Sequence, residues 1–301
     1  MSSSDRPVVV FGGSGFLGRA IVACLVDAGH TVRIATRRAA DHAGSVEWRQ
    51  ADIRDEASVS GAIEGCAAVV NAVGLYAESK TERFEATHEG GARIVARQAA
   101  QQGVEQLVHI SGIGADPASR SSYVRARARG EALVQEAYPA ATILRPSALF
   151  GPDDALINGL ADLARRAPFV PLFGRGQTRL QPVYVGDVAR AAVGALSMPS
   201  ARGKVFELGG PRIYTYRGLL ALVLDAMGKR RPMAPVPFTL WDLVAAVSAV
   251  LPSPPITEAQ VTLMRADNVV SGDMPSLLDL GIEPTALESV LPGYRLSSAA
   301  G

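Results

Sequence analysis

The N-terminal segment combines a buried-strand pattern with three regularly spaced glycines. Residues 8–11 are uniformly apolar, Gly12, Gly15 and Gly18 follow, and an amphipathic helical pattern runs from about residue 19 to 28. Gly12 lets the chain turn out of the strand, Gly15 lets the backbone approach a phosphate, and Gly18 lets a helix lie close to the strand. Amide groups and the positive dipole end of that helix then face an anion. The segment therefore predicts a cradle for a dinucleotide pyrophosphate, although an ordinary strand-to-helix turn is the alternative. The predicted cradle consists of Gly12, Gly13, Ser14, Gly15, Phe16, Leu17 and Gly18.

Short apolar runs alternate with helical patterns through the first half of the chain. The predicted strands after the first are residues 31–35, 46–50, 67–71, 106–110 and 141–145. Strands that alternate with helices pair in parallel through right-handed crossovers. The sequence therefore predicts an α/β fold built on a Rossmann-type doubly wound parallel sheet. Residues 1–150 are expected to form the dinucleotide-binding core.

The second half of the chain breaks this alternation with many Gly and Pro residues. It contains helical patterns at about 155–166, 186–197, 216–227, 239–250 and 257–266, with a further strand at 205–208. We expect residues 151–301 to form a smaller, mostly helical lobe that faces a substrate or partner and is interwoven with late sheet elements.

Composition narrows the classes of protein that fit. The 30 basic and 29 acidic residues leave a net charge of +1, which does not favour a nucleic-acid partner. Cys24 and Cys66 lie in apolar surroundings typical of a reducing compartment, and they predict no metal site. The first six residues are polar and predict no secretory signal. The apolar stretch 237–251 is too short to span a bilayer, so we expect a cytoplasmic protein.

The residues after the second predicted strand indicate which dinucleotide is bound. An acidic residue at this place binds both hydroxyls of an unphosphorylated ribose, but the sequence has Arg37 and Arg38 after Thr36. Guanidinium groups pair with a 2′-phosphate, so NADP(H) is favoured over NAD(H). The alternative is that both arginines form a solvated helix start. Further cofactor contacts are expected after the third and fourth strands, at Asp52, Ile53, Ala72, Val73 and Gly74.

Several further motifs occur in a fixed order along the chain. They are residues 109–115 with Ser111, Tyr123, residues 130–131, residues 144–147 with Pro146, residues 181–189 and residues 207–211. Together with the glycine turn, they make the chain similar to the atypical extended short-chain dehydrogenase/reductases. The resemblance is closest to the branch that contains accessory subunit nine of respiratory complex I and its bacterial relatives, and it covers nearly the whole chain.

This resemblance implies a nicotinamide-ribose site built from Ser111, Tyr123, Arg127 and Pro146. In active members a Ser polarises the substrate oxygen, a Tyr transfers the proton, and a Lys four residues later lowers the pKa of the Tyr. Here that fourth residue is Arg127, which keeps the positive charge but does not release a proton. Ser111, Tyr123 and Arg127 are thus either catalytic or only a cofactor anchor. His109 is expected to be a core residue, and His88 is expected to be solvated.

Three functions fit these residues. The resemblance implies an accessory or assembly and stability subunit of complex I with tightly bound NADP(H), placed in the cytoplasm or at the inner face of the cytoplasmic membrane. The second is an NADPH-dependent reductase of a hydrophobic carbonyl or quinone-related substrate, and the third is an NADP(H) redox sensor. The apolar segment 236–252 is expected either to contact a partner or a lipid interface, or to be buried against its own lobe.

Overall fold

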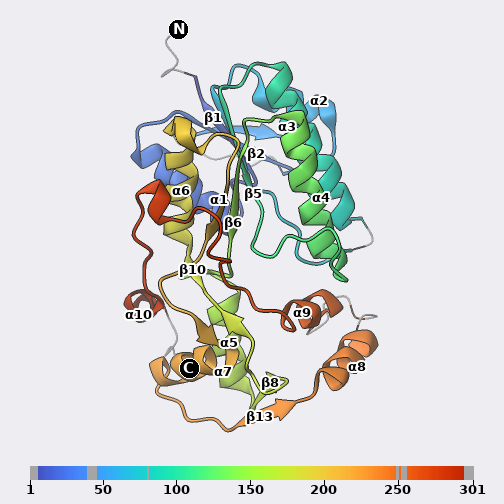
Figure 1. Cartoon of the computed structure of the whole chain (residues 1–301), viewed down its shortest axis with the longest axis vertical. Coiled ribbons are helices and arrows are strands. Elements are labelled where there is room, and N and C mark those ends of the chain that lie inside the picture. Colours follow the sequence, from blue (N-terminus) through green and yellow to red (C-terminus); the bar gives the residue numbers. More distant parts are fainter. Residues whose placement is uncertain (1–5, 39–45, 80, 249–250, 252–255, 295–301) are drawn as a thin grey trace. The chain divides into compact units, whose positions relative to one another are not determined.

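The computed structural model describes residues 6–38, 46–79, 81–248, 251 and 256–294 (Figure 1). The chain divides into two compact units. The first contains Met1–Pro146, Val185–Leu208 and Ser271–Glu283, and the second contains Ser147–Tyr184, Gly209–Val270 and Pro284–Gly301.

The first unit is built on a seven-stranded sheet in which all paired neighbours are parallel. Its order is β11-β6-β5-β4-β1-β2-β3, so the chain order reverses between β1 and β4. The strands are β1 (Val8–Phe11), β2 (Val32–Thr36), β3 (Glu47–Gln50), β4 (Ala68–Asn71), β5 (Gln106–Ile110), β6 (Thr142–Pro146) and β11 (Val205–Leu208). The predicted doubly wound α/β fold is confirmed. Ligands of such sheets bind at the carboxyl ends of the strands beside this reversal.

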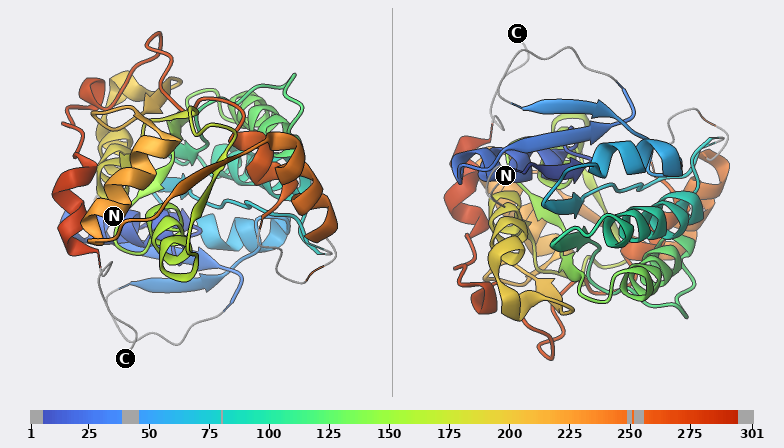
Figure 2. Two further views of the ribbon diagram at one scale, coloured as in Figure 1. Left: turned by 90° about the horizontal axis from the view of Figure 1, so that it is seen from below. Right: turned by 90° about the horizontal axis from the view of Figure 1, so that it is seen from above.

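Helices cover both faces of this sheet (Figure 2). On one face α1 (Phe16–Asp27) packs against α6 (Val185–Ser197), and on the other α3 (Ala92–Gln101) packs between α2 (Glu56–Ile63) and α4 (Ser122–Ala137). The second face holds a hydrophobic core to which β1, β4 and β5 contribute Val9, Val69 and Leu107. Short 3-10 turns, η3 (Pro199–Ala201) and η4 (Leu278–Leu280), complete the unit.

The helical segment from Glu85 to Gln101 is divided into two parts. Its first part is a π-helix, η2 (Glu85–Gly91), which continues directly into α3. Two glycines allow neighbours to lie very close to η2: a Cβ on Gly91 would be 2.6 Å from Cδ1 of Ile53, and a Cβ on Gly130 would be 2.9 Å from the carbonyl carbon of His88. Sequence periodicity does not reveal such a widened turn.

The second unit packs short strand pairs and helices around its own core. Two pairs are parallel, β7 with β10 and β8 with β13, and β9 pairs antiparallel with β12. The strands are β7 (Leu149–Phe150), β8 (Val170–Phe173), β9 (Arg179–Leu180), β10 (Val183–Tyr184), β12 (Tyr214–Thr215) and β13 (Met233–Val236). The helices are α5 (Leu156–Arg166), α7 (Tyr216–Ala226), α8 (Phe238–Ser248), α9 (Glu258–Leu263), α10 (Leu287–Val290) and the 3-10 turn η5 (Leu291–Gly293).

Apolar faces of α5 and α7 fill the centre of this second unit, with Leu160, Leu219 and Val223 buried there. Thr215 caps α7 by accepting a hydrogen bond from the amide of Gly218, and Thr257 forms a capping box with Gln260 at the start of α9. Within the described ranges, no helix has the length and apolar character needed to cross a membrane.

Candidate functional site

The glycine turn after β1 has the geometry predicted for an anion cradle. Gly12 has a φ of +78°, and a Cβ there would lie 2.8 Å from the carbonyl oxygen of Ala72. A Cβ on Gly18 would lie 2.7 Å from the carbonyl carbon of Gly12, so α1 rests directly on the turn. The Gly15 amide donates to the Gly12 carbonyl over 2.9 Å, and α1 begins at Phe16. The helix α1 therefore starts directly after the glycine turn, at which Ser14 and Gly15 are exposed.

Nothing in the described part of the chain competes with an anion for this helix start. Gly15 contributes no side-chain cap, and the first turn of α1 carries no acidic residue. The first amides of a helix are unsatisfied unless a cap or ligand accepts from them. The observed turn therefore fits a pyrophosphate by its backbone donors and by the room that Gly12 and Gly18 leave.

The two arginines after β2 lie at the neighbouring strand end. Arg37 forms an ion pair with Glu82, and Arg38 is exposed. Oγ of Ser14 lies 3.4 Å from Oγ1 of Thr36, which brings the glycine turn and this strand end together. The pairing of Glu82 with Arg37 could not be predicted from the sequence, because Glu82 lies on a loop far along the chain from Arg37.

Asp52 and Ile53 follow β3 and differ in character. Asp52 binds Arg54 through both carboxylate oxygens, at 2.5 Å between Oδ2 and Nη2, and this hydrogen bonding holds the pKa of Asp52 below its ordinary value. The Ser58 hydroxyl donates to the Asp52 carbonyl over 3.1 Å. Ile53 is buried beneath Gly91. The carboxylate of Asp52 is thus already bound by Arg54, and the main-chain amide and carbonyl of Asp52 both bond to the Ser58 hydroxyl.

The chain after β4 passes directly beside the glycine turn. The Ala72 amide donates to the Phe11 carbonyl over 2.9 Å, and the Val73 amide donates to Oδ1 of Asn71 over 3.2 Å. Gly74 is exposed and Val73 is half-buried. These residues therefore lie at the carboxyl end of β4, beside the point at which the chain order reverses.

The structure brings Ser111, Tyr123 and Arg127 into one cluster after β5. Nη1 of Arg127 donates to the Tyr123 hydroxyl over 2.7 Å, and the guanidinium carbon lies 5.2 Å from the ring centroid. A Cβ on Gly112 would overlap this guanidinium, so Gly112 provides the space it occupies. Backbone hydrogen bonds from Ser111 to Leu144 at 2.7 Å and from Ile113 to Pro146 at 3.1 Å fix the loop.

Two features of this cluster matter for chemistry. The hydroxyl of Ser111 is buried and has no hydrogen-bond partner among the described residues, so it is available to a ligand oxygen. Tyr123 is 4% exposed, and burial raises its pKa to about 12 even though Arg127 favours the charged form. Tyr123 is therefore a neutral hydrogen-bond donor near pH 7.

Aromatic side chains that sequence reasoning did not select surround Tyr123. Its ring centroid lies 5.3 Å from that of Phe84, 5.5 Å from that of His88 and 5.9 Å from that of Tyr76. The expectation that His88 is solvated is wrong: its Nε2 lies 2.9 Å from the Leu75 carbonyl oxygen, and desolvation lowers its pKa to about 4. The physical reason is packing, because the His88 ring lies against the rings of Phe84 and Tyr123, with centroid separations of 6.2 and 5.5 Å.

His109 is buried, as expected, on β5. Its Nδ1 lies 3.3 Å from Nδ2 of Asn71, and burial lowers its pKa to about 3. Cys66 is also buried, and burial raises the pKa of its thiol to about 11. Neither group is therefore a charged reactant near neutral pH.

Comparisons with known proteins identify the family of the chain. Residues 8–209 match the NAD dependent epimerase/dehydratase family. The chain is 32% identical over 307 residues to NADH dehydrogenase (ubiquinone) 1 alpha subcomplex subunit 9, mitochondrial, of Arabidopsis thaliana, which covers 95% of this chain and 76% of that protein. It is 29% identical over 267 residues to a ceramide reductase of Caulobacter vibrioides, covering 85% and 83% of the two proteins.

Solved structures show the same fold at low sequence identity. The structure of the UDP-glucose 4-epimerase of Thermus thermophilus in complex with NAD has a TM-score of 0.70 and 22% identity, with 95% of this chain and 96% of that chain covered.

Proposed function

Because the chain belongs to the NAD dependent epimerase/dehydratase family, we propose that it holds NADP(H) tightly and serves as an accessory or assembly and stability subunit of respiratory complex I. The relative named as a subunit of NADH dehydrogenase supports the partner, since its similarity extends over 95% of this chain. The glycine turn supports the cofactor. The proposed location is the cytoplasm or the inner face of the cytoplasmic membrane.

The environment of Arg127 is the observation that carries this proposal over an enzymatic one. The guanidinium is fixed by the Tyr123 hydroxyl at 2.7 Å and by the space over Gly112. A guanidinium does not release a proton in proteins, so this residue holds its partners in place and cannot relay protons as a lysine does. Ser111, Tyr123 and Arg127 then bind the nicotinamide ribose and keep the cofactor in place.

The preference for NADP(H) over NAD(H) is proposed on charge. Arg37 and Arg38 lie at the strand end beside the glycine turn, and a 2′-phosphate offers them further negative charge. The ion pair between Arg37 and Glu82 is exposed to solvent. Breaking it therefore costs little free energy, and Arg37 can bind another anion instead. A bound phosphate thus replaces Glu82 as the partner of Arg37.

Isolation from solubilised native membranes tests the proposal. We expect the tagged full-length chain to bring down complex I subunits and to retain NADP(H), identified by mass spectrometry of the denatured sample. A Gly12→Val variant places a side chain against Ala72 and is expected to lose the nucleotide, whereas Gly203→Ala, at another left-handed glycine, is the backbone-strain control. Recovery of the chain without any complex I subunit would reject the partner, and an empty wild-type protein would reject the cofactor.

A second candidate is an NADPH-dependent reductase of a hydrophobic carbonyl. The buried, unpartnered hydroxyl of Ser111 in the described part of the chain favours it, as does the similarity to the ceramide reductase. Ser111 would donate a hydrogen bond to the carbonyl oxygen and the neutral Tyr123 hydroxyl would donate the proton, while NADPH, when bound, would supply the hydride. NADPH oxidation with lipid ketones and quinones measures this activity, and Tyr123→Phe must abolish it if the assignment is correct.

A further inference from the structure

Helix α8 exposes one continuous apolar face. Leu240 is 48% exposed, Leu243 58%, Val244 38% and Val247 68%. These positions recur at helical spacing and form a single stripe, called the α8 stripe below. The sequence left open whether this segment is buried or contacts a partner. In the structure one face of α8 is exposed and the other is buried.

The opposite face of α8 anchors the helix to the second unit. Ala245 is buried against Ile256 and Val261, and Nε1 of Trp241 donates to the Leu172 carbonyl over 3.1 Å. The α8 stripe is thus presented by a fixed helix. The acidic residue on α8, Asp242, is neutralised by Arg265 through contacts of 2.6 and 2.7 Å.

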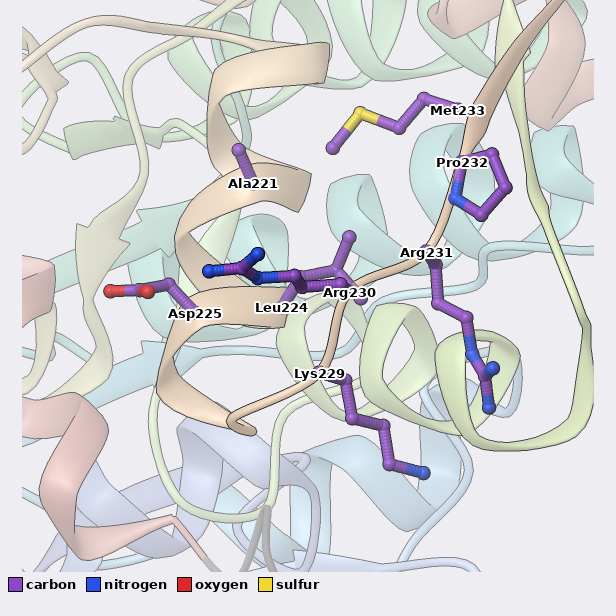
Figure 3. Close-up of a pocket in the computed structure, with 8 residues that line it drawn as sticks. All are labelled: Ala221, Leu224, Asp225, Lys229, Arg230, Arg231, Pro232 and Met233. Atoms are coloured by element: carbon purple, nitrogen blue, oxygen red, sulfur yellow. The ribbon is translucent and has the colours of Figure 1, made fainter.

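A cluster of cations lies on the segment that leads to α8. Lys229, Arg230 and Arg231 line a shallow cavity of about 440 Å³ after the end of α7, together with one carboxylate, Asp225 (Figure 3). Figure 3 shows Lys229 and Arg231 extending to one side of the chain, while Arg230 points towards Asp225. The cluster therefore keeps an excess of positive charge.

The two-stranded ribbon of β8 and β13 connects this cluster to α8. At one end the pairing places Phe169, 48% exposed, next to Pro232 and the cations. At the other end a Cβ on Gly174 would lie 3.0 Å from the ring of Phe238 at the start of α8, and the exposed Arg175 follows Gly174. Four residues per strand span about 13 Å. In Figure 1 the chain runs from α7 through β13 to α8, so the cations directly precede β13 and the α8 stripe directly follows it.

From this arrangement we infer that the β8–β13 edge and the α8 stripe dock the protein onto the surface of an anionic lipid bilayer. Apolar side chains on a fixed helix enter the headgroup boundary, and Lys229, Arg230 and Arg231 pair with lipid phosphates. The flanking cations favour an anionic bilayer as the occupant, because phospholipid headgroups supply the negative charge that these cations attract. The inference depends neither on the bound nucleotide nor on complex I.

Co-sedimentation with vesicles tests the inference. The full chain is mixed at low salt with phosphatidylcholine vesicles, with and without 30% phosphatidylglycerol, and we expect binding only to the anionic vesicles. The variant Leu243→Glu with Val247→Glu is expected to bind about 100-fold more weakly, because each carbon withdrawn from lipid lowers affinity several-fold. Lys229→Gln with Arg230→Gln is expected to bind roughly 25-fold more weakly, at about fivefold per charge.

Matched controls separate the stripe from general surface changes. Ile213→Glu with Leu278→Glu alters two apolar residues exposed by 50% and 59%, and Arg202→Gln with Lys204→Gln removes two exposed cations. Both controls should bind like wild type. Absence of wild-type binding to anionic vesicles, equal losses in controls and test variants, or a solution dimer that only the stripe variant dissociates would each overturn the inference. Retained NADP(H) in the stripe variant shows that the nucleotide site is unaffected.

Discussion

Replacing Gly130 on α4 by alanine tests how closely α4 packs against η2. A Cβ at this position would lie 2.9 Å from the carbonyl carbon of His88 and would overlap its oxygen. The neighbour is backbone, so no side-chain rotation relieves the overlap and the two helices must separate by roughly 1 Å. Overpacking lowers the free energy of unfolding by up to about 3 kcal/mol. The higher helix propensity of alanine relative to glycine adds back about 1 kcal/mol. We expect the variant to be destabilised by about 2 kcal/mol.

Thermal unfolding followed by circular dichroism measures this effect. A loss of about 2 kcal/mol lowers the Tm by about 5 °C for a domain of this size. Gly194→Ala is the matched control, because Gly194 also lies inside a helix, α6, but a Cβ there meets nothing within 4 Å. The control should raise the Tm by about 2 °C through helix propensity alone. An unchanged or raised Tm for Gly130→Ala would refute the close approach of α4 to η2.

Three further predictions concern the site. Arg37→Ala should weaken NADPH binding about tenfold and leave NADH binding unchanged in calorimetric titrations, because a charge-assisted hydrogen bond to the 2′-phosphate is lost; equal losses for both nucleotides would contradict the assignment. Tyr123→Phe should leave the nucleotide affinity within about threefold of wild type, because the variant loses only one hydrogen bond of about 0.5 kcal/mol and Arg127 is still present. A tenfold loss in the same titration would show that the Tyr123 hydroxyl provides most of the binding. For His88, whose pKa falls to about 4 in the folded protein, the unfolded chain takes up its proton first as the pH drops from 6.5, so stability declines between about pH 6.5 and 4. Urea unfolding should show a shallower decline for His88→Gln, and parallel pH profiles would rule out this residue as a cause.

The sequence determined the central sheet, because local runs of apolar residues are enough to locate its strands. The strands β5 and β11 have the predicted bounds, Gln106–Ile110 and Val205–Leu208, and most other strands differ by a residue. Buried parallel strands are continuous apolar runs, and such runs are visible without knowledge of their neighbours. The glycine turn was likewise predictable, since Gly12 and Gly18 each meet a steric requirement within the same strand, turn and helix.

Contacts between residues far apart in the sequence were decided only by the tertiary structure. The pairing of Arg37 with Glu82, the inward position of His88 on a π-helix and the space that Gly112 leaves for Arg127 all depend on which elements pack together. Periodicity also could not tell which face of α8 is buried, because apolar side chains lie on both. The sequence specifies the types of side chain and their local order, whereas packing selects their partners, because close contact between distant segments depends on the whole fold.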